Sequence, residues 1–575
     1  MANNLFLRGP TLHDLPDAHF PASQRTISPP PDRSEDTAAR IQVMAKGVAA
    51  GTADVSRVEA PVTIRAYLLC TFASFGGILF GYDSGYINGV LGMAYVKKNF
   101  GGPVPLEVDA TGYNVETWQK SLIVSILSVG TFLGALAGGA IAEWLGRRPT
   151  IMLSCLIFSV GVAVQTAAVN VGALVAGRVV AGLGVGGVSA VVILYVSEIS
   201  PKRVRGVLVS IYQWAVTIGL LISACADQGT SNINNASSYR IPIGLQLIWA
   251  AILAGGLFFL PESPRYLIKE GKPEQAAKAL CRVRGQPIES EYIQAELAEI
   301  QANFDYEMRI ASSSWLDCFK GGWSPSGNFR RVVVGVALQM FQQWTGINFI
   351  FYYGTTFFQQ SGIDNPFLIS VITNIVNVVS TPLAFYTIER FGRRTLLIWG
   401  AVLMLVCEFI VAIVGTAAPG SVAASKVLIT FVCVYIFGFA STWGPAAWVV
   451  IGELFPLPIR AKGVALSTAS NWLWNCVIAV ITPYIVDPGY GNLGPKVFFV
   501  WGSALVLCLI YAYLCVPETK GLSLEQIDRM LEETTPRTSA GWVPHDTFAS
   551  KMGTADVAPT EEVVTTKDEP TTEKV

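Results

Sequence analysis

The sequence predicts an all-α membrane protein with twelve membrane-spanning helices in two halves of six. Its 575 residues are 52% hydrophobic and only 14% charged, whereas a soluble protein of this length carries about 25% charged residues. Apolar runs long enough to cross a hydrocarbon core of ~30 Å recur along the chain, and three short motifs each occur twice at a nearly constant separation. The composition therefore predicts a lipid-facing surface, and the repeated motifs predict a duplication.

The predicted spans divide the chain into five segments. The apolar runs lie at 65–87, 120–142, 150–169, 172–196, 206–226, 243–261, 332–357, 366–388, 396–416, 427–451, 463–486 and 497–516. They place one six-helix half at 62–261 and a second at 331–521, with a charged linker of amphipathic helices at 262–330 between them. The polar segments 1–61 and 522–575 are predicted to be cytoplasmic tails, the first disordered and the second mostly so.

Loop charges predict the orientation in the membrane, because Lys and Arg concentrate in cytoplasmic loops. If both termini are cytoplasmic, the basic residues of the short inner loops outnumber those of the outer loops. They are Arg147, Arg148, Lys202, Arg203, Arg205, Arg390, Arg393, Arg394, Arg460 and Lys462. The Asn235-Ala236-Ser237 sequon then lies outside, where it is available for N-glycosylation.

Composition and motif content also exclude several function classes. The net charge of −1 disfavours a nucleic-acid partner, which needs a basic surface. The cysteines show no CxxC spacing and the chain has no GxxxxGK[ST] phosphate loop, so we expect no metal, no other cofactor, no ATP site and no enzymatic activity. The first 60 residues hold no apolar segment of a cleaved signal peptide, so the first span is expected to direct membrane insertion itself.

Each of three motifs occurs once in each predicted half. "EWLGRR" at 143 recurs as "ERFGRR" at 389, "EISPKRVR" at 198 as "ELFPLPIR" at 453, and "PESPR" at 261 as "PETKG" at 517. The copies lie 246, 255 and 256 residues apart. A nearly constant shift indicates two halves related by duplication, an architecture in which transporters place the substrate between repeats.

With these motifs in order, and with "QQWTGINFIFYYG" at 342–354 and "LSLEQID" after the last span, the sequence resembles the sugar porter family of the major facilitator superfamily. The resemblance covers about residues 62–530 and is closest to the fungal monosaccharide transporters. It implies the major facilitator fold, a small-molecule sugar as substrate, and alternating access. It also implies a monomer that crosses the lipid bilayer of the plasma membrane many times.

The seventh span combines the side chains that a sugar site needs. Sugar hydroxyls are matched by neutral donors and acceptors backed by aromatic rings, and this span carries Gln342, Gln343, Asn348, Tyr352 and Tyr353. On a straight helix Gln342 and Asn348 would lie about 120° apart. We therefore predict that the helix breaks at residues 345–346, which would let all these side chains face one cavity.

The resemblance implies sugar contacts in further spans. The full predicted set is Gln213, Gln342, Gln343, Asn348, Tyr353, Asn377, Trp443, Trp448 and Asn471. The two tryptophans are equal candidates for the ring that stacks on the sugar. Lone amides also join helices by hydrogen bonds, and this alternative stays open for Asn377.

Asp83, in "GGILFGYDSGY" of the first span, occupies a position where a carboxylate costs about 2.5–3.5 kcal/mol on insertion scales. All three histidines lie in the predicted tails, so a proton carrier within the membrane must be a carboxylate. Asp83 resembles the acid in the first span of sugar–proton symporters, and the resemblance implies Arg178 of the fourth span as its partner. The alternative is a static Asp83–Arg178 pair that ties two helices together. For Glu408, the other acid well inside a span, we expect a structural role.

Acidic and basic side chains gather at the cytoplasmic ends of both halves. The set comprises Glu143, Arg147, Arg148, Glu198, Arg205, Glu389, Arg393, Glu453 and Arg460. The resemblance implies a gate that locks the halves while the cavity faces outward. Such a network biases a two-state equilibrium when it breaks as a unit; charges that only set the orientation are the alternative.

The sequence therefore predicts a monosaccharide transporter coupled to protons, for a hexose such as glucose and with xylose as a second candidate. Two alternatives stay open: a facilitator that moves sugar down its gradient, and a glucose sensor that binds without transporting. About 55 residues follow Gly521, fewer than in the long C-terminal extensions of family sensors, which disfavours the sensor.

Overall fold

The computed structural model describes residues 62–543 except 105–111, 311–313, 326, 361–365, 419–420, 487–489 and 492. The predicted disordered tail at 1–61 and the end of the second tail, 544–575, lie outside the described residues. The described chain is helical apart from a hairpin of two short strands, β1 (Gly102–Pro103) and β2 (Tyr113–Asn114).

Two sets of long helices build the molecule. The N half contains α2 (Ile64–Ser74), α3 (Gly76–Gly92), α4 (Ala94–Phe100), α5 (Thr117–Trp144), α6 (Arg147–Ala167), α7 (Val171–Ile199), α8 (Arg205–Thr230) and α9 (Ser237–Leu257). The C half contains α13 (Asn328–Trp344), α14 (Ile347–Gln360), α15 (Pro366–Ser380), α16 (Leu383–Phe391), α17 (Arg393–Ala417), α18 (Val422–Ser441), α19 (Trp443–Glu453), α20 (Arg460–Val486) and α21 (Val497–Cys515). The chain segment that connects the halves contains α10 (Pro264–Lys269), α11 (Pro273–Arg284), α12 (Glu291–Ile310) and the short η2 (Trp315–Phe319).

The helices account for the twelve predicted spans. Within the described part of the chain, ten helical segments are long and apolar enough to cross a membrane, and the bent pair α15–α16 adds an eleventh. The remaining span is the seventh, in which α13 has 17 residues and α14 has 14. Neither reaches the roughly 20 residues that a crossing needs, and the two follow one another along the chain, separated by residues 345–346.

The predicted break in the seventh span is confirmed. Helix α13 ends at Trp344 and α14 begins at Ile347, and Gly346 between them has a φ of 83°. Only glycine adopts this backbone conformation without a steric penalty. A Cβ atom at this position would also lie 2.7 Å from Cγ of Trp501, so glycine is required twice over at the break.

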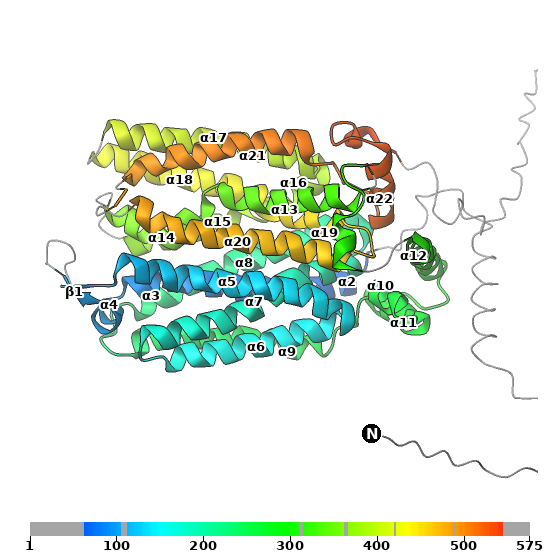
Figure 1. Cartoon of the computed structure of the whole chain (residues 1–575), viewed down its shortest axis with the longest axis horizontal. Helices are drawn as coiled ribbons and strands as arrows, with labels where there is room; N and C mark the ends of the chain where they lie inside the picture. Colours follow the sequence, from blue (N-terminus) through cyan, green and yellow to red (C-terminus); the bar gives the residue numbers. More distant parts are fainter. Residues whose placement is uncertain are drawn as a thin grey trace, which may run out of the picture.

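Figure 1 shows the two halves as two layers of long helices lying side by side, with α5 and α7 facing α20 across their boundary. We call the end that carries α10–α12 and α22 (Leu524–Glu533) the linker end, and the end that carries β1 and α4 the hairpin end. Helix α6 begins at Arg147 and α17 begins at Arg393, so each copy of the GRR motif lies at the start of a helix. Both copies lie at the linker end. This placement follows the predicted duplication.

The second tail is more ordered than the sequence predicted. Its first part forms α22, which begins with a capping box between Ser523 and Gln526 and buries Ile527 and Met530. Arg331 of α13 forms an ion pair with Asp528. An amphipathic helix with a capped start and a buried apolar face is stable against a protein surface, so the boundary of the predicted disorder was placed too early.

Candidate functional site

The break in the seventh span lies within a set of bonded amide side chains. Gln342 donates from Nε2 to the carbonyl oxygens of Trp443 and Gly444 at 3.1 and 3.0 Å. Asn471 of α20 donates from Nδ2 to Oε1 of Gln342 at 2.8 Å and to Oε1 of Gln339 at 2.7 Å. Three spans of the C half thus meet at Gln342, directly before the break.

A second amide group bridges the break, from Gln343 of α13 to Asn348 of α14. Oε1 of Gln343 accepts from Asn348 and, at 3.3 Å, from Nδ2 of Asn475. Asn475 also contacts the Tyr352 hydroxyl at 3.0 Å and accepts at 2.7 Å from Ser128, which belongs to α5 of the N half. These polar side chains therefore reach the boundary between the halves.

The two candidate tryptophans have different surroundings. Trp448 donates from Nε1 to Oε1 of Gln213 at 3.1 Å, so this pair joins α19 of the C half to α8 of the N half. Trp443 donates to the carbonyl oxygen of Leu397 at 2.8 Å and is held inside the C half. Of the two tryptophans, only Trp448 bonds to a predicted sugar-binding residue of the other half.

Two further predicted ligands occupy contrasting positions. The Tyr353 hydroxyl donates to the carbonyl oxygen of Ala479 at 2.9 Å and ties α14 to α20. Asn377 of α15 is 1% exposed, and its Oδ1 atom accepts no hydrogen bond from the described residues. A buried acceptor without a donor is rare in folded proteins, so Asn377 has capacity to bind a ligand.

Asp83 and Arg178 are both buried, at 0% and 1% exposure, and Arg178 is the charged group whose field acts on Asp83. Among the described residues, neither carboxylate oxygen of Asp83 has a hydrogen-bond partner. Arg178 instead donates from Nη1 to the Tyr86 hydroxyl at 2.7 Å, and that hydroxyl donates to Gln165 at 2.6 Å. The expected pair is close but not in direct contact in this conformation.

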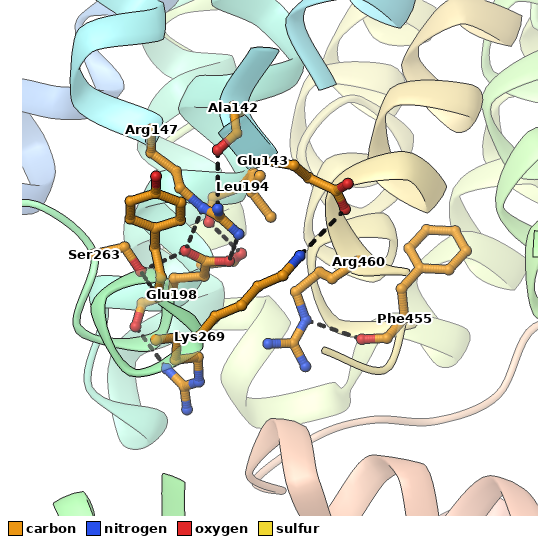
Figure 2. A network of polar contacts seen from close by, with 12 residues as sticks. Ala142, Glu143, Arg147, Leu194, Glu198, Ser263, Lys269, Phe455 and Arg460 are labelled. Atoms are coloured by element: carbon orange, nitrogen blue, oxygen red, sulfur yellow. Dashed lines mark hydrogen bonds and ion pairs between the residues drawn. The ribbon is translucent and has the colours of Figure 1, made fainter. Parts of the chain in front are cut away.

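At the linker end, an ion pair joins two helices of the N half. Arg147, at the start of α6, donates to both carboxylate oxygens of Glu198 of α7 at 2.9 and 2.8 Å. Ser263 donates to Glu198 at 2.5 Å, and Figure 2 shows these side chains converging below Ala142. The Glu262 carboxylate accepts from the backbone N–H groups of Arg147 and Arg148 at 3.1 Å. Burial raises the pKa of Glu262 above its ordinary value, against the opposing effect of these donors.

The C half repeats this arrangement. Arg393, at the start of α17, donates to Glu453 of α19 at 3.3 and 3.0 Å, and Thr519 donates to Glu453 at 2.7 Å. The Glu518 carboxylate accepts from the backbone N–H groups of Arg393 and Arg394 at 2.9 and 3.1 Å. Each half therefore has an arginine, a glutamate, a hydroxyl donor and a second glutamate that caps the helix N-terminus.

One ion pair crosses the boundary between the halves at this end. Lys462 of α20 pairs with Glu143 of α5, and Lys269 of α10 approaches the other oxygen of Glu143 at 3.6 Å. Burial lowers the pKa of Lys269 below its ordinary value, and Glu143 opposes that effect. Figure 2 shows Lys269 reaching towards Glu143, with Arg460 of the C half beside it. The contact between the halves thus includes the linker.

The remaining predicted residues lie near this site or away from it. Arg148 donates to the carbonyl oxygen of Phe258 at 3.2 Å and faces α9, whereas Arg205 is buried at the start of α8. Glu389 pairs with Arg393 at 3.1 Å within its own half. Asn235 is exposed in the turn before α9. Glu408 is fully buried in α17, and no described residue donates a hydrogen bond to its carboxylate.

Sequence reasoning missed several residues of these networks, among them Ser128, Gln339, Asn475, Lys269 and, as a partner of Glu143, Lys462. Two of them carry a helical signal, because Asn475 follows Asn471 by four residues and Gln339 precedes Gln342 by three, spacings that share one face of a helix. Ser128, Lys269 and Lys462 act through partners more than a hundred residues away in the sequence. Only the tertiary structure brings those partners together.

Comparison with known proteins assigns the family. The profile of the "Sugar (and other) transporter" family matches residues 69–531. The chain is 46% identical to the high glucose sensor RGT2 of Saccharomyces cerevisiae over 82% of its own length and 61% of that protein. It is 43% identical to the probable glucose transporter rco-3 of Neurospora crassa, over 81% of its length and 79% of that protein.

Solved structures agree with this relationship. The proton:xylose symporter XylE bound to 6-bromo-6-deoxy-D-glucose matches with a TM-score of 0.70 and 28% identity, over 81% of this chain and 99% of that one. The inward-open conformation of XylE from E. coli matches less closely, with a TM-score of 0.61, 27% identity and the same two coverages. With its duplicated linker-end network, its broken seventh span and these relatives, the chain belongs to the sugar porter family of the major facilitator superfamily.

Proposed function

We propose that this protein transports a hexose, with glucose as the first candidate, by alternating access between its two halves. The carrying observation is the polar set at the break of the seventh span, which reaches the N half through the Gln213–Trp448 bond and the Ser128–Asn475 bond. Neutral amides and an indole at a boundary between two moving halves suit a substrate made of hydroxyl groups and apolar ring faces.

The amides around Gln342 bond to one another and to backbone carbonyl oxygens. Asn471 donates to Gln342, and Gln342 donates to two backbone carbonyls. A sugar hydroxyl can replace these bonds in kind, because it both donates and accepts. Asn377 and Asn471 each keep a buried Oδ1 atom without a donor, and sugar hydroxyls supply the missing donors. Trp448 is the stacking ring in this proposal.

In this proposal the Glu143–Lys462 pair holds the linker end closed. We place this end in the cytoplasm and the protein in the plasma membrane. Opening towards the cytoplasm then requires Glu143 and Lys462 to separate, while the ion pairs within each half hold its helices together.

Proton coupling is the second part of the proposal, and it rests on Asp83. A buried carboxyl group without a paired cation is more stable in its neutral, protonated form. Arg178 is held by Tyr86 rather than by Asp83, which is the arrangement in which Asp83 holds a proton. A rearrangement of α3 against α7 within the N half that brings Arg178 into contact with Asp83 during the cycle would release the proton on the other side.

The test measures sugar-driven proton movement in vesicles that contain the purified protein. Wild type should take up glucose with alkalinisation of the outside medium. Asp83→Asn should keep glucose exchange and lose accumulation, because an amide carries no proton. Gln342→Ala should lose both. Uptake by wild type without any proton signal would make the protein a facilitator. Binding without uptake would favour a sensor, the function that the name of RGT2 states for that relative.

A further inference from the structure

A small pocket lies towards the hairpin end, on the boundary between the two halves. Its lining comes from α3 and α8 of the N half and from α14 and α15 of the C half. The polar lining residues are Asn88, Asp227, Ser370 and Asn374, and Phe351 provides an apolar wall. Because the walls belong to different halves, this pocket must widen when the halves separate at the hairpin end.

Two side chains in the pocket have unused acceptor atoms. Asp227 is 3% exposed and Asn374 is 5% exposed, and the Oδ1 atom of each accepts no hydrogen bond from any residue that the structure describes. The Asn374 amide is oriented by its own Nδ2, which donates to the Ser370 carbonyl oxygen at 2.9 Å. Buried acceptors are rarely left without a donor, so we expect a bound ligand to supply one.

The fold holds Asp227 against helix α3. A Cβ atom on Gly89 would collide with the Asp227 carboxylate, so only glycine at this position lets the acid lie flat on α3. The neighbouring Gly85 also lines the pocket without a side chain. Helices α3 and α8 therefore pack closely here, and the Asp227 carboxyl group lines the pocket together with Asn374 of the other half.

We propose that this pocket is a second sugar-binding site, in which Asp227 and Asn374 accept hydrogen bonds from the hydroxyls of a hexose passing between the hairpin end and the amide site. The proposal rests on the proposed function. Asn374 precedes the predicted sugar-binding residue Asn377 by about one helical turn on α15, so the pocket lies next to that residue. A carboxylate, an amide and an aromatic wall form the same kind of surface for a neutral polyol as the amide site does.

The experiment measures the concentration dependence of D-glucose uptake from the hairpin side by Asp227→Asn, Asn374→Ala and a control, Thr230→Val. Thr230 lies one turn further along α8 and bonds to the carbonyl oxygen of Ala226. Losing one hydrogen bond to a sugar hydroxyl corresponds to about a five- to tenfold rise in KM, which we expect for Asp227→Asn. Asn374→Ala should raise KM by a smaller factor, and Thr230→Val should leave it unchanged.

Maximal rate and pH dependence separate this role from others. The proposal requires an unchanged pH profile and maximal rates within about twofold of wild type. The reason is that the variants lose a hydrogen bond to a sugar hydroxyl and no step of the transport cycle. An unchanged KM in both pocket variants overturns it. So does a fall in maximal rate alone, which indicates a structural role, or a shifted pH profile with lost accumulation, which makes Asp227 a proton carrier. Asn374→Ala tests the same pocket from the C half if Asp227→Asn fails to fold. If wild type moves no sugar, the proposed function itself fails, and the pocket proposal with it.

Discussion

The two linker-end networks have the same core and different surroundings. In the N half, Arg147 pairs with Glu198, and the neighbouring acid Glu143 reaches the other half at Lys462. In the C half, Arg393 pairs with Glu453 at 3.0 Å and also with Glu389, the counterpart of Glu143, at 3.1 Å. Duplication thus kept the bonds that hold each half together, whereas Glu143 bonds to the other half and its counterpart Glu389 bonds within its own.

The difference assigns separate roles to two groups of charges. Within each half, the arginine and glutamate are nearly inaccessible, with side-chain exposures of 0–2%. The crossing pair is more exposed, at 4% for Lys462 and 14% for Glu143. A buried pair is costly to break and suits a permanent joint, while a partly hydrated pair exchanges readily with water and suits a contact that opens in every cycle.

The largest expected effect comes from breaking either permanent joint. Arg147→Gln and Arg393→Gln each leave a buried glutamate without its cation, which costs about 3–5 kcal/mol of unfolding free energy. The loss should be larger for Arg393→Gln, because that change leaves both Glu453 and Glu389 unpaired. Thermal unfolding of the purified variants measures this order. Arg148→Gln is the matched control, since Arg148 faces α9, and equal losses in all three would contradict the comparison.

Removing the hydroxyl donors should have a smaller effect that still distinguishes the halves. Ser263→Ala and Thr519→Val each remove one hydrogen bond to a buried carboxylate, worth about 1.5–3 kcal/mol. Ser263 also accepts from the backbone N–H of Tyr266 at the start of α10. Ser263→Ala should therefore lower the unfolding temperature more than Thr519→Val does.

A variant that keeps the hydroxyl serves as the control for this series. Ser263→Thr should stay close to wild type in unfolding temperature. If Ser263→Ala is no less stable than Ser263→Thr, the hydroxyl contributes nothing to the joint and the assigned bond is wrong.

The crossing pair should affect stability least and conformation most. Lys462→Met should change the unfolding free energy by about 1 kcal/mol or less, while shifting the halves towards separation at the linker end by roughly fivefold. Cys318 of η2 can report the opening of the linker end. It is buried, and it lies close enough to Lys462 and Glu143 for their charges to act on its thiol. Burial raises the pKa of its thiol to about 11, so a thiol reagent at neutral pH reacts with it slowly while the end is closed.

Labelling of Cys318, followed by mass spectrometry, should accelerate about fivefold in Lys462→Met. A coupling of about 1 kcal/mol between the two charges corresponds to that factor. The charge exchange Glu143→Lys with Lys462→Glu should restore the wild-type rate only in part, because it places a second ammonium group beside that of Lys269. Lys269→Met should have a smaller effect than Lys462→Met, since its ammonium lies 3.6 Å from Glu143. Labelling that does not respond to Lys462→Met would show that this pair does not hold the end closed.

Much of the fold and part of the candidate site could be predicted from the sequence. The twelve spans follow from runs of apolar residues, and the break at Gly346 follows from the conflict between the positions of Gln342 and Asn348 on a straight helix. The duplicated motifs placed Arg147, Glu198, Arg393 and Glu453 in equivalent positions. The ordered start of the second tail was missed, because its stability comes from packing α22 against the C half rather than from composition.

Other features were decided by tertiary structure alone. The sequence determined the spans, their halves and the polar residues within them, because burial in lipid and helical geometry act locally along the chain. The structure decided which partners those residues have: Lys462 for Glu143, Trp448 for Gln213, and Tyr86 rather than Asp83 for Arg178. Such pairings depend on how the helices of the two halves pack against each other. The local sequence does not determine the distance between side chains from different helices.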